Sequence, residues 1–112
     1  MEKYFVLDER GEPLEEPDFE VWSRWFEQAD RCVARTSVTR DITVLTIFSG
    51  IDVAEPGRYP FPFQTDVLGG WLDGEQKRHR SRADAIGGHV ELVEWCRLSC
   101  APDGGITDKD IT

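Results

Sequence analysis

The sequence predicts an α+β fold: a single antiparallel β-sheet of four to five strands with two helices packed on one face, in the order β-α-β-β-β-β-α. Two apolar runs, at residues 42–48 and 61–68, are typical of strands because they are rich in β-branched and aromatic residues. Two other segments, at residues 19–30 and 81–97, place apolar residues at the spacing of an amphipathic helix. The short connections between strands favour antiparallel neighbours.

The first half of the chain opens with a strand at residues 3–8 and an acidic extended connection at residues 12–17. Asp18 is a suitable N-cap for the helix at residues 19–30. The apolar residues of this helix fall on one stripe, which we expect to be buried; the alternative is an exposed aromatic contact patch. The stripe consists of Trp22, Trp25, Phe26, Ala29 and Val33.

The middle of the chain predicts a hairpin, in which a strand at residues 32–38 turns into the strand at residues 42–48. Residues 49–60 contain too many glycines and prolines for regular structure. After the strand at residues 61–68 we expect a glycine-rich turn and a polar edge strand at residues 75–80.

The last predicted element is a helix that starts after Ser81, where Ser81 and Asp84 match a capping box. Two adjacent glycines, Gly87 and Gly88, lie inside it, and each costs about 1 kcal/mol relative to alanine. That cost is tolerated if a neighbouring backbone or aromatic ring must come close. The expected stripe of this helix is Ile86, Val90, Val93 and Arg97, with Leu92 and Trp95 flanking it. We expect residues 1–100 to form one domain and residues 101–112 a flexible tail.

Charge is the main guide to partners. The 112 residues carry a net charge of −9, which disfavours direct binding to nucleic acid or to anionic membranes and favours a basic protein surface. Residues 1–30 hold ten acidic and three basic residues, a balance of −7. Residues 77–82 form a short basic island. Either patch can be an interface or simply a solvated surface.

The cysteines do not indicate a metal site. Cys32, Cys96 and Cys100 have no CxxC spacing, and the chain has only two histidines, whereas structural zinc needs four ligands in a tighter pattern. We expect buried or half-buried free thiols, no metal and no cofactor. No secretory signal or membrane-spanning run is visible. The expected location is therefore the cytoplasm.

Several short motifs occur in an ordered succession. They are WSRWFE and ADRCVA within residues 22–34, TIFSGID at residues 46–52, FQTDVLGG at residues 63–70, LDG at residues 72–74, Arg78, and the Gly88-His89 pair. This succession resembles a family of short phage and prophage proteins with the pattern WxRWFE, TVFLGxD, FETMVFGG, LDGxxxR and GH. The resemblance covers residues 4 to 95 and implies a phage origin without an established activity. Many relatives have His where this chain has Val53, and Gln64 and Asp66 replace their Glu and Met.

One acid–base set can be assembled from the sequence, namely Asp52, Asp73 and His89. Nothing in the sequence places these groups together, and carboxylates that follow glycines are common turn caps. We interpret His89 as a packing histidine satisfied by a backbone carbonyl, and His79 as an exposed residue. The glycine-rich run at residues 69–74 lacks the spacing of a phosphate-binding loop. We therefore expect no catalytic residues and a protein that is not an enzyme.

These observations favour a small acidic module that binds a protein partner. It would be a phage inhibitor of the anti-defence, anti-CRISPR-like kind, docking on a basic nucleic-acid-binding surface of a bacterial complex. The expected contact residues are Asp8, Glu9, Glu12, Glu15, Glu16, Asp18 and Glu20. One alternative is a structural or housekeeping phage protein that forms a homo-oligomer through the turn at Trp71 and the adjacent edge strand. Another is a small hydrolase built on Asp52 and His89.

Overall fold

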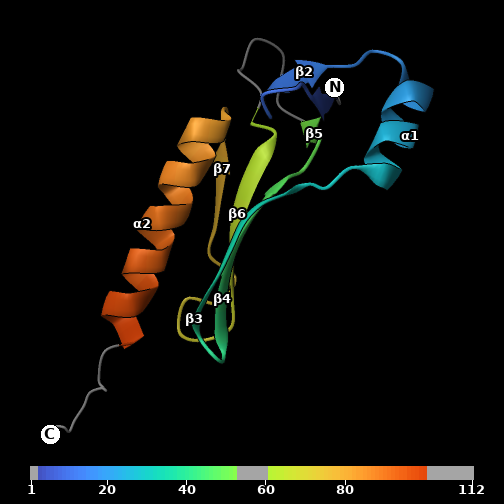
Figure 1. Ribbon diagram of the computed structural model, residues 1–112. Helices are drawn as coiled ribbons and strands as arrows, with labels where there is room; N and C mark the ends of the chain where they lie inside the picture. The colour runs from blue at the N-terminus through green and yellow to red at the C-terminus, as the bar shows by residue number, and fades with distance from the viewer. Residues whose placement is uncertain (1–2, 53–60, 101–112) are drawn as a thin grey trace, which may run out of the picture.

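The computed structural model describes residues 3–52 and 61–100 and confirms an α+β fold (Figure 1). Its elements are β1 (Lys3–Leu7), β2 (Pro13–Glu15), α1 (Phe19–Gln28), β3 (Cys32–Thr39), β4 (Ile42–Phe48), β5 (Ile51–Asp52), β6 (Phe63–Leu68), β7 (Gln76–His79) and α2 (Arg82–Cys100). The strongest predicted strand, at residues 42–48, has the predicted bounds. The predictions for residues 53–60 and for the tail at residues 101–112 lie outside the described residues.

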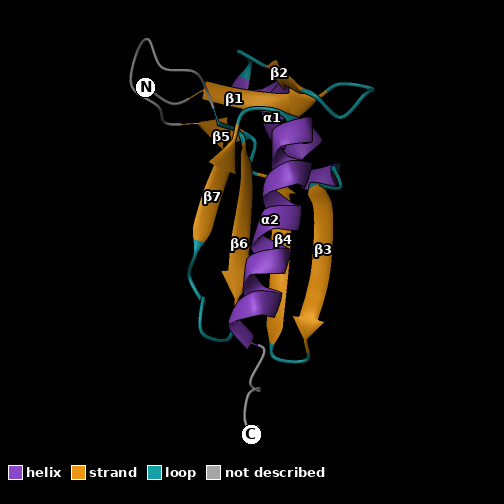
Figure 2. Ribbon diagram, turned by 90° about the vertical axis from the view of Figure 1, so that its left-hand side faces the viewer, coloured by secondary structure: helices purple, strands orange, loops and turns teal. Residues whose placement is uncertain are grey.

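The strands are divided between two sheets, whereas the sequence predicted one. A four-stranded sheet has the order β3-β4-β6-β7, and a smaller sheet has the order β2-β1-β5. Every strand pair in both sheets is antiparallel. Figure 2 shows the small sheet lying across the upper end of the larger one.

The helices also pack on different strands. Helix α2 contacts all four strands of the large sheet, and α1 contacts β1. In Figure 1 the two helices lie on opposite sides of the strands, so the large sheet has α2 on one face only.

Both helices begin where the sequence predicts. The carboxylate of Asp18 accepts hydrogen bonds from the backbone N–H groups of Glu20 and Val21, which makes it the N-cap of α1. The hydroxyl of Ser81 accepts one from the N–H of Asp84 at 3.1 Å. The reverse bond of a capping box does not form between these two described residues.

The aromatic stripe of α1 contacts the small sheet and the upper end of the large one. Trp22 is buried, and its indole N–H donates to the carbonyl of Phe5 at 3.0 Å. Trp25 packs edge-on against Phe48 of β4. The expectation of a buried stripe is therefore confirmed for Trp22, while Trp25 is half-buried.

The buried stripe of α2 is one residue away from the predicted one. Ala85, His89, Leu92 and Cys96 face the sheet, together with Val93, whereas Ile86 and Val90 are exposed. The helix carries apolar residues on several sides, so periodicity alone did not define its orientation. In this orientation His89 contacts the sheet.

The core under α2 consists of two apolar clusters. The lower one contains Ile42, Val44, Val67, Leu92, Val93 and Cys96. The upper one contains Phe5, Phe48, Phe63 and Ala85. Strand β4 alternates buried and half-buried residues along its length, so its residues 42, 44, 46 and 48 all face α2. Thr46 therefore lies between the two clusters, and so does its cross-strand partner Thr65 on β6.

Candidate functional site

A chain of five polar side chains crosses the core between the two apolar clusters. Thr36 Oγ1 lies 2.8 Å from His89 Nε2, and His89 Nδ1 lies 2.8 Å from Thr46 Oγ1. The chain continues over 2.6 Å to Thr65 Oγ1 and over 2.9 Å to His79 Nε2. We call these five residues the Thr–His chain. It connects β3, α2, β4, β6 and β7 in that order.

Four of the five side chains in the Thr–His chain are buried, and Thr36 at one end is half-buried. Thr46 and Thr65 have no exposed surface, and His89 and His79 are 5% and 8% exposed. A buried polar group without a hydrogen-bond partner costs about 1–3 kcal/mol, so these side chains depend on one another. Its two inner hydroxyls and both ring nitrogens of His89 are paired within the chain.

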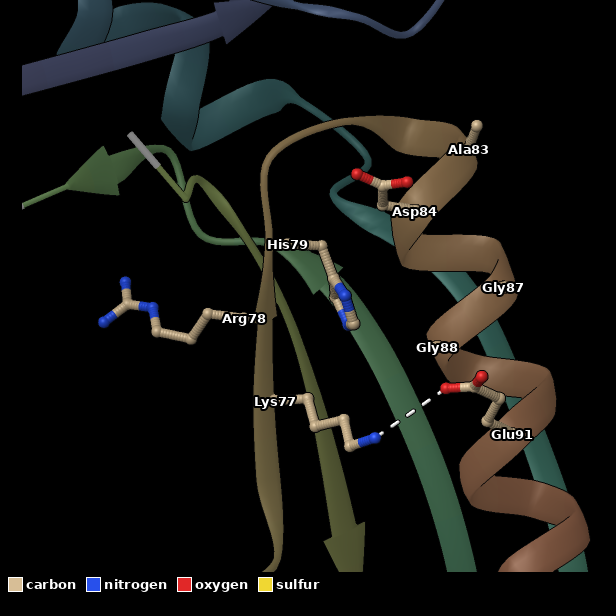
Figure 3. Close-up of a pocket in the computed structure, with 8 residues that line it drawn as sticks. All are labelled: Lys77, Arg78, His79, Ala83, Asp84, Gly87, Gly88 and Glu91. Atoms are coloured by element: carbon tan, nitrogen blue, oxygen red, sulfur yellow. Dashed lines mark ion pairs between the residues drawn. The ribbon is translucent and has the colours of Figure 1, made fainter. Parts of the chain in front are cut away.

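One end of the chain opens on a groove between β7 and α2 (Figure 3). The groove has a volume of about 490 Å³, and its walls include His79, Asp84 and the Gly87-Gly88 pair. The ring of His79 lies against Gly88, where a Cβ atom would overlap the imidazole. Nδ1 of His79 has no hydrogen-bond partner among the described residues. Below the ring, Lys77 forms an ion pair with Glu91 at 3.7 Å.

The surroundings favour neutral imidazoles at both histidines. Burial lowers the pKa of His79 below its ordinary value of 6.5, and Lys77 acts in the same direction, while Asp84 and Glu91 oppose it. Burial alone lowers the pKa of His89. Both histidines are therefore mostly neutral near pH 7, when each ring has one donor and one acceptor nitrogen.

The connection from Thr65 to His79, with Asp84 nearby, has the order of groups found in hydrolases that use a hydroxyl nucleophile. The position of Thr65 argues against that role. Its hydroxyl has no exposed surface and already bonds Thr46, so it cannot reach a substrate in the groove. The only imidazole atom of this group that is left for a ligand is Nδ1 of His79.

Four of the seven acidic residues predicted as contacts have local structural roles. Asp8 accepts the N–H groups of Arg10 and Glu12 in the β1–β2 turn, and these bonds lower its pKa. Glu16 accepts the N–H of Asp18, and Asp18 caps α1. The carboxylate of Glu12 accepts the N–H of Arg82 at 3.3 Å. These bonds hold the turn, the helix start and the first residue of α2.

The other three, Glu9, Glu15 and Glu20, are exposed, and their carboxylates form no hydrogen bond or ion pair with any described residue. All seven lie in the β1–β2 turn, in β2, in the connection to α1 or in its first turn. Figures 1 and 2 place these segments together at the upper end of the molecule. We call this set the acidic end.

The acid–base set considered from the sequence is not assembled. Asp73 accepts the N–H of Gly69 at 2.6 Å within the β6–β7 turn, at the lower end of the sheet. His89 bonds two threonines under α2, so it is a packing histidine satisfied by hydroxyls and not by a carbonyl. Asp52 belongs to β5 at the upper end, and its side chain lies outside the described part. The interpretation of His79 as exposed was wrong.

The described part of the chain contains few other groups that could bind a metal ion or act as a nucleophile. Cys96 is buried, as expected for a thiol of this chain, whereas Cys32 is exposed and departs from that expectation. Across residues 3–52 and 61–100, no three side chains of the His, Cys, Asp or Glu type are grouped as a metal ion requires. None of the helices found there has the length and apolar character that crossing a membrane demands.

Comparisons with protein-family models, with curated proteins and with solved structures find no match to this chain. The resemblance to short phage proteins therefore stands on its motifs alone.

The sequence did not reveal the Thr–His chain. One signal was present: Thr46 and Thr65 each interrupt the buried face of an apolar strand, and the two strands pair so that these residues are opposite. Two buried hydroxyls at matching positions imply further polar partners. The sequence offered no means of finding that these partners are His79 and His89.

Proposed function

We propose that this protein is a small binding module of phage type, which docks through its acidic end on a basic, nucleic-acid-binding surface of a bacterial protein complex and inhibits it there. The observation that carries the proposal is the excess of acidic residues at this end. Residues 3–30 contain nine acidic and three basic residues, a balance of −6. Among the described residues the one ion pair, Lys77–Glu91, lies elsewhere.

Such a surface favours encounter with a cationic partner. Clustered charges of one sign raise association rates with an oppositely charged surface, and salt screens the effect. The caps formed by Asp8 and Asp18 hold the backbone of the turn and of the helix start in place, so the exposed glutamates beside them project from fixed backbone positions. The structural acids therefore shape the surface, and Glu9, Glu15 and Glu20 are the carboxylates free to contact a partner.

The test begins with capture of the partner from a bacterial lysate and its identification by mass spectrometry. The variant Glu9→Ser/Glu15→Ser/Glu20→Ser removes three charges without touching a cap. We expect its association rate with the captured partner to fall by about tenfold at low salt. The wild-type rate should decline toward that of the variant as salt is added.

The matched control removes three exposed acids at the other end of the molecule, as Asp41→Ser/Glu75→Ser/Glu94→Ser. This variant has the same net charge as the first one. Equal loss of binding in both variants would mean that net charge acts without a defined surface. Unchanged binding of the Glu9/Glu15/Glu20 variant at low salt would rule out docking through the acidic end.

A second candidate is self-association through the lower end, as expected for a homo-oligomeric phage protein. Trp71 in the β6–β7 turn is 87% exposed, and Leu98 near the end of α2 is also exposed. Trp71 and Ser99 line one small crevice, which places the turn beside the last turns of α2. Exposed tryptophans are frequent anchors of protein interfaces. Light scattering of the wild type and of Trp71→Ser distinguishes a monomer from an oligomer that depends on this residue.

A further inference from the structure

We infer that the Thr–His chain is a binding site for a single proton: either histidine can become cationic, but both cannot without leaving one buried hydroxyl hydrogen unpaired. This inference is independent of the proposed docking function. It follows from counting hydrogens along the four hydrogen bonds that join Thr36, His89, Thr46, Thr65 and His79.

With both histidines neutral, the chain has two complete arrangements. In the first, Thr36 donates to His89, whose Nδ1–H donates to Thr46; Thr46 then donates to Thr65, and Thr65 to Nε2 of His79. In the second, every donor is reversed, beginning with Nε2–H of His79. Each hydroxyl has one hydrogen and each neutral ring one N–H, so the direction of one bond sets the next.

The two neutral arrangements have a consequence for tautomers. In the first, both imidazoles carry the hydrogen on Nδ1; in the second, both carry it on Nε2. A mixture of tautomers fails at the bond between Thr46 and Thr65. If both rings donate to these hydroxyls, one hydroxyl hydrogen has no acceptor. If both rings accept from them, the two oxygens, 2.6 Å apart, face each other with no hydrogen between them. The two histidines must therefore share one tautomer.

One added proton fits the chain. If His79 is cationic, it donates from Nε2 to Thr65, and the second arrangement holds through to Thr36. If His89 is cationic, it donates to Thr36 and Thr46, and the bonds from Thr46 to His79 keep the first direction. Thr36 is half-buried, so its own hydrogen can reach solvent.

A second proton does not fit. Both rings then donate inward, to Thr46 and to Thr65, and these hydroxyls have a single bond between them. One of the two hydroxyl hydrogens is left without an acceptor inside a region with no exposed surface. Such a group bears the full cost of its desolvation.

The charged groups around the chain favour His79 as the first site. On its own strand β7 are Lys77 and Arg78, the latter pointing away from the groove (Figure 3). From α2, Asp84 and Glu91 face His79, and they favour its cation. The neighbouring residues of β6, Phe63 and Thr65, carry no charge. The proton enters from the groove through Nδ1.

The surroundings of His89 give it no such support. The strands packed against it, β3 and β4, contribute Thr36 and Thr46, and burial is the sole influence on its pKa. Once His79 holds the proton, protonation of His89 requires the chain to break. Because the chain joins α2 to the sheet, a second proton weakens that contact.

The first test is a tautomer measurement on the unmodified full chain at about pH 8, where both rings are neutral. Nitrogen-15 chemical shifts of the imidazoles distinguish Nδ1–H from Nε2–H. We expect the same tautomer at His79 and His89. Opposite tautomers would overturn the inference without any variant being needed.

The second test follows both imidazoles by NMR during titration of the wild type, His79→Gln and Thr65→Val. In His79→Gln we expect the pKa of His89 to rise by about one unit or more, the shift expected of strongly coupled sites. In Thr65→Val both rings stay in place, but Thr46 loses its acceptor. A cationic His89 then leaves the hydrogen of Thr46 unpaired, so the pKa of His89 should stay as low as in the wild type. The control Thr43→Val lies on β4 facing away from α2, and it should leave both titrations unchanged.

An unchanged pKa of His89 in His79→Gln would mean that the two sites are not coupled. An equal rise in Thr65→Val would assign the coupling to charge repulsion through space, because His79 loses its acceptor in that variant and stays neutral. Either result rejects a shared proton site.

Discussion

At the residue scale, the paired glycines of α2 have different roles. The sequence predicted that a helix would tolerate them if a ring or backbone had to come close. This is confirmed at Gly88, because the imidazole of His79 occupies the place of a Cβ atom. It does not hold for Gly87, which is exposed and has no atom within 4 Å of that place. One glycine therefore makes room for the Thr–His chain, and the other widens the groove.

This difference predicts opposite effects of alanine at adjacent positions. Gly88→Ala forces the buried ring of His79 to move and should lower the free energy of unfolding by about 1–3 kcal/mol. Gly87→Ala has space and improves helix propensity, so it should raise that energy by about 0.5–1 kcal/mol. Urea denaturation of both variants measures the two changes. If both proteins are stabilised, the ring of His79 does not lie against Gly88.

At the element scale, the strongly patterned segments were predictable, and the short ones were not. Strand β4 follows from seven consecutive residues of high β-propensity. Strands β2 and β5 have three and two residues, and they exist through pairing with β1. No local pattern encodes such a pairing. For the same reason the sequence did not predict the division into two sheets.

The orientation of α2 shows how tertiary contacts decide between similar patterns. The stripe beginning at Ile86 and the stripe beginning at Ala85 both have helical spacing. The second is buried, and it includes His89, which meets the hydroxyls of Thr36 and Thr46. A single histidine is a weak guide to the buried face, because its partners Thr36 and Thr46 belong to distant parts of the sequence. Local sequence patterns do not show that these three elements pack together.

Helix α1 depends on its first turn, because it has only ten residues. Asp18→Ala removes the acceptor for the N–H groups of Glu20 and Val21 and should cost about 1 kcal/mol of stability. Asp18→Asn keeps a side-chain acceptor and removes the charge, so it should retain most of that stability. Urea denaturation of the two variants separates capping from charge. Equal loss in both would assign the effect to the charge of Asp18.

The same pair of variants bears on the acidic end. If Asp18 acts in docking only by holding α1, then Asp18→Asn should bind the partner nearly as well as the wild type. If its charge contacts the partner, Asp18→Asn should bind as weakly as Asp18→Ala. The result separates the structural acids from the contact acids, a distinction that the sequence could not make.

At the scale of the whole molecule, the two candidate contact surfaces lie at opposite ends. The acidic end lies at the small sheet, and the exposed Trp71 lies at the opposite end of the large sheet. Composition predicted the first feature, since most of the acids cluster in residues 1–30. Between these ends, the Thr–His chain divides the core into two apolar clusters. Its position makes the stability of the entire fold depend on the charge state of two histidines.

That dependence predicts how stability changes with pH. Both histidines have a pKa in the folded state below the ordinary value of 6.5. At pH values near and below 6.5 the unfolded chain therefore binds more protons than the folded one. The free energy of unfolding falls as the pH decreases from about 7 to about 5. Each additional proton bound by the unfolded chain contributes at most about 1.4 kcal/mol per pH unit. The ordinary pKa values of Asp and Glu, about 3.9 and about 4.3, lie below this interval, which leaves it to the histidines.

Urea denaturation at several pH values between about 5 and 8 measures the effect. The variant His79→Gln/His89→Gln has no imidazole, and its stability should be nearly constant across this interval. The single variants should each retain part of the slope, because one buried imidazole remains in each. A wild-type protein whose stability is constant from about pH 8 to 5 would show that these imidazoles are not buried between α2 and the sheet. A double variant with the wild-type slope would place the titrating group elsewhere in the chain.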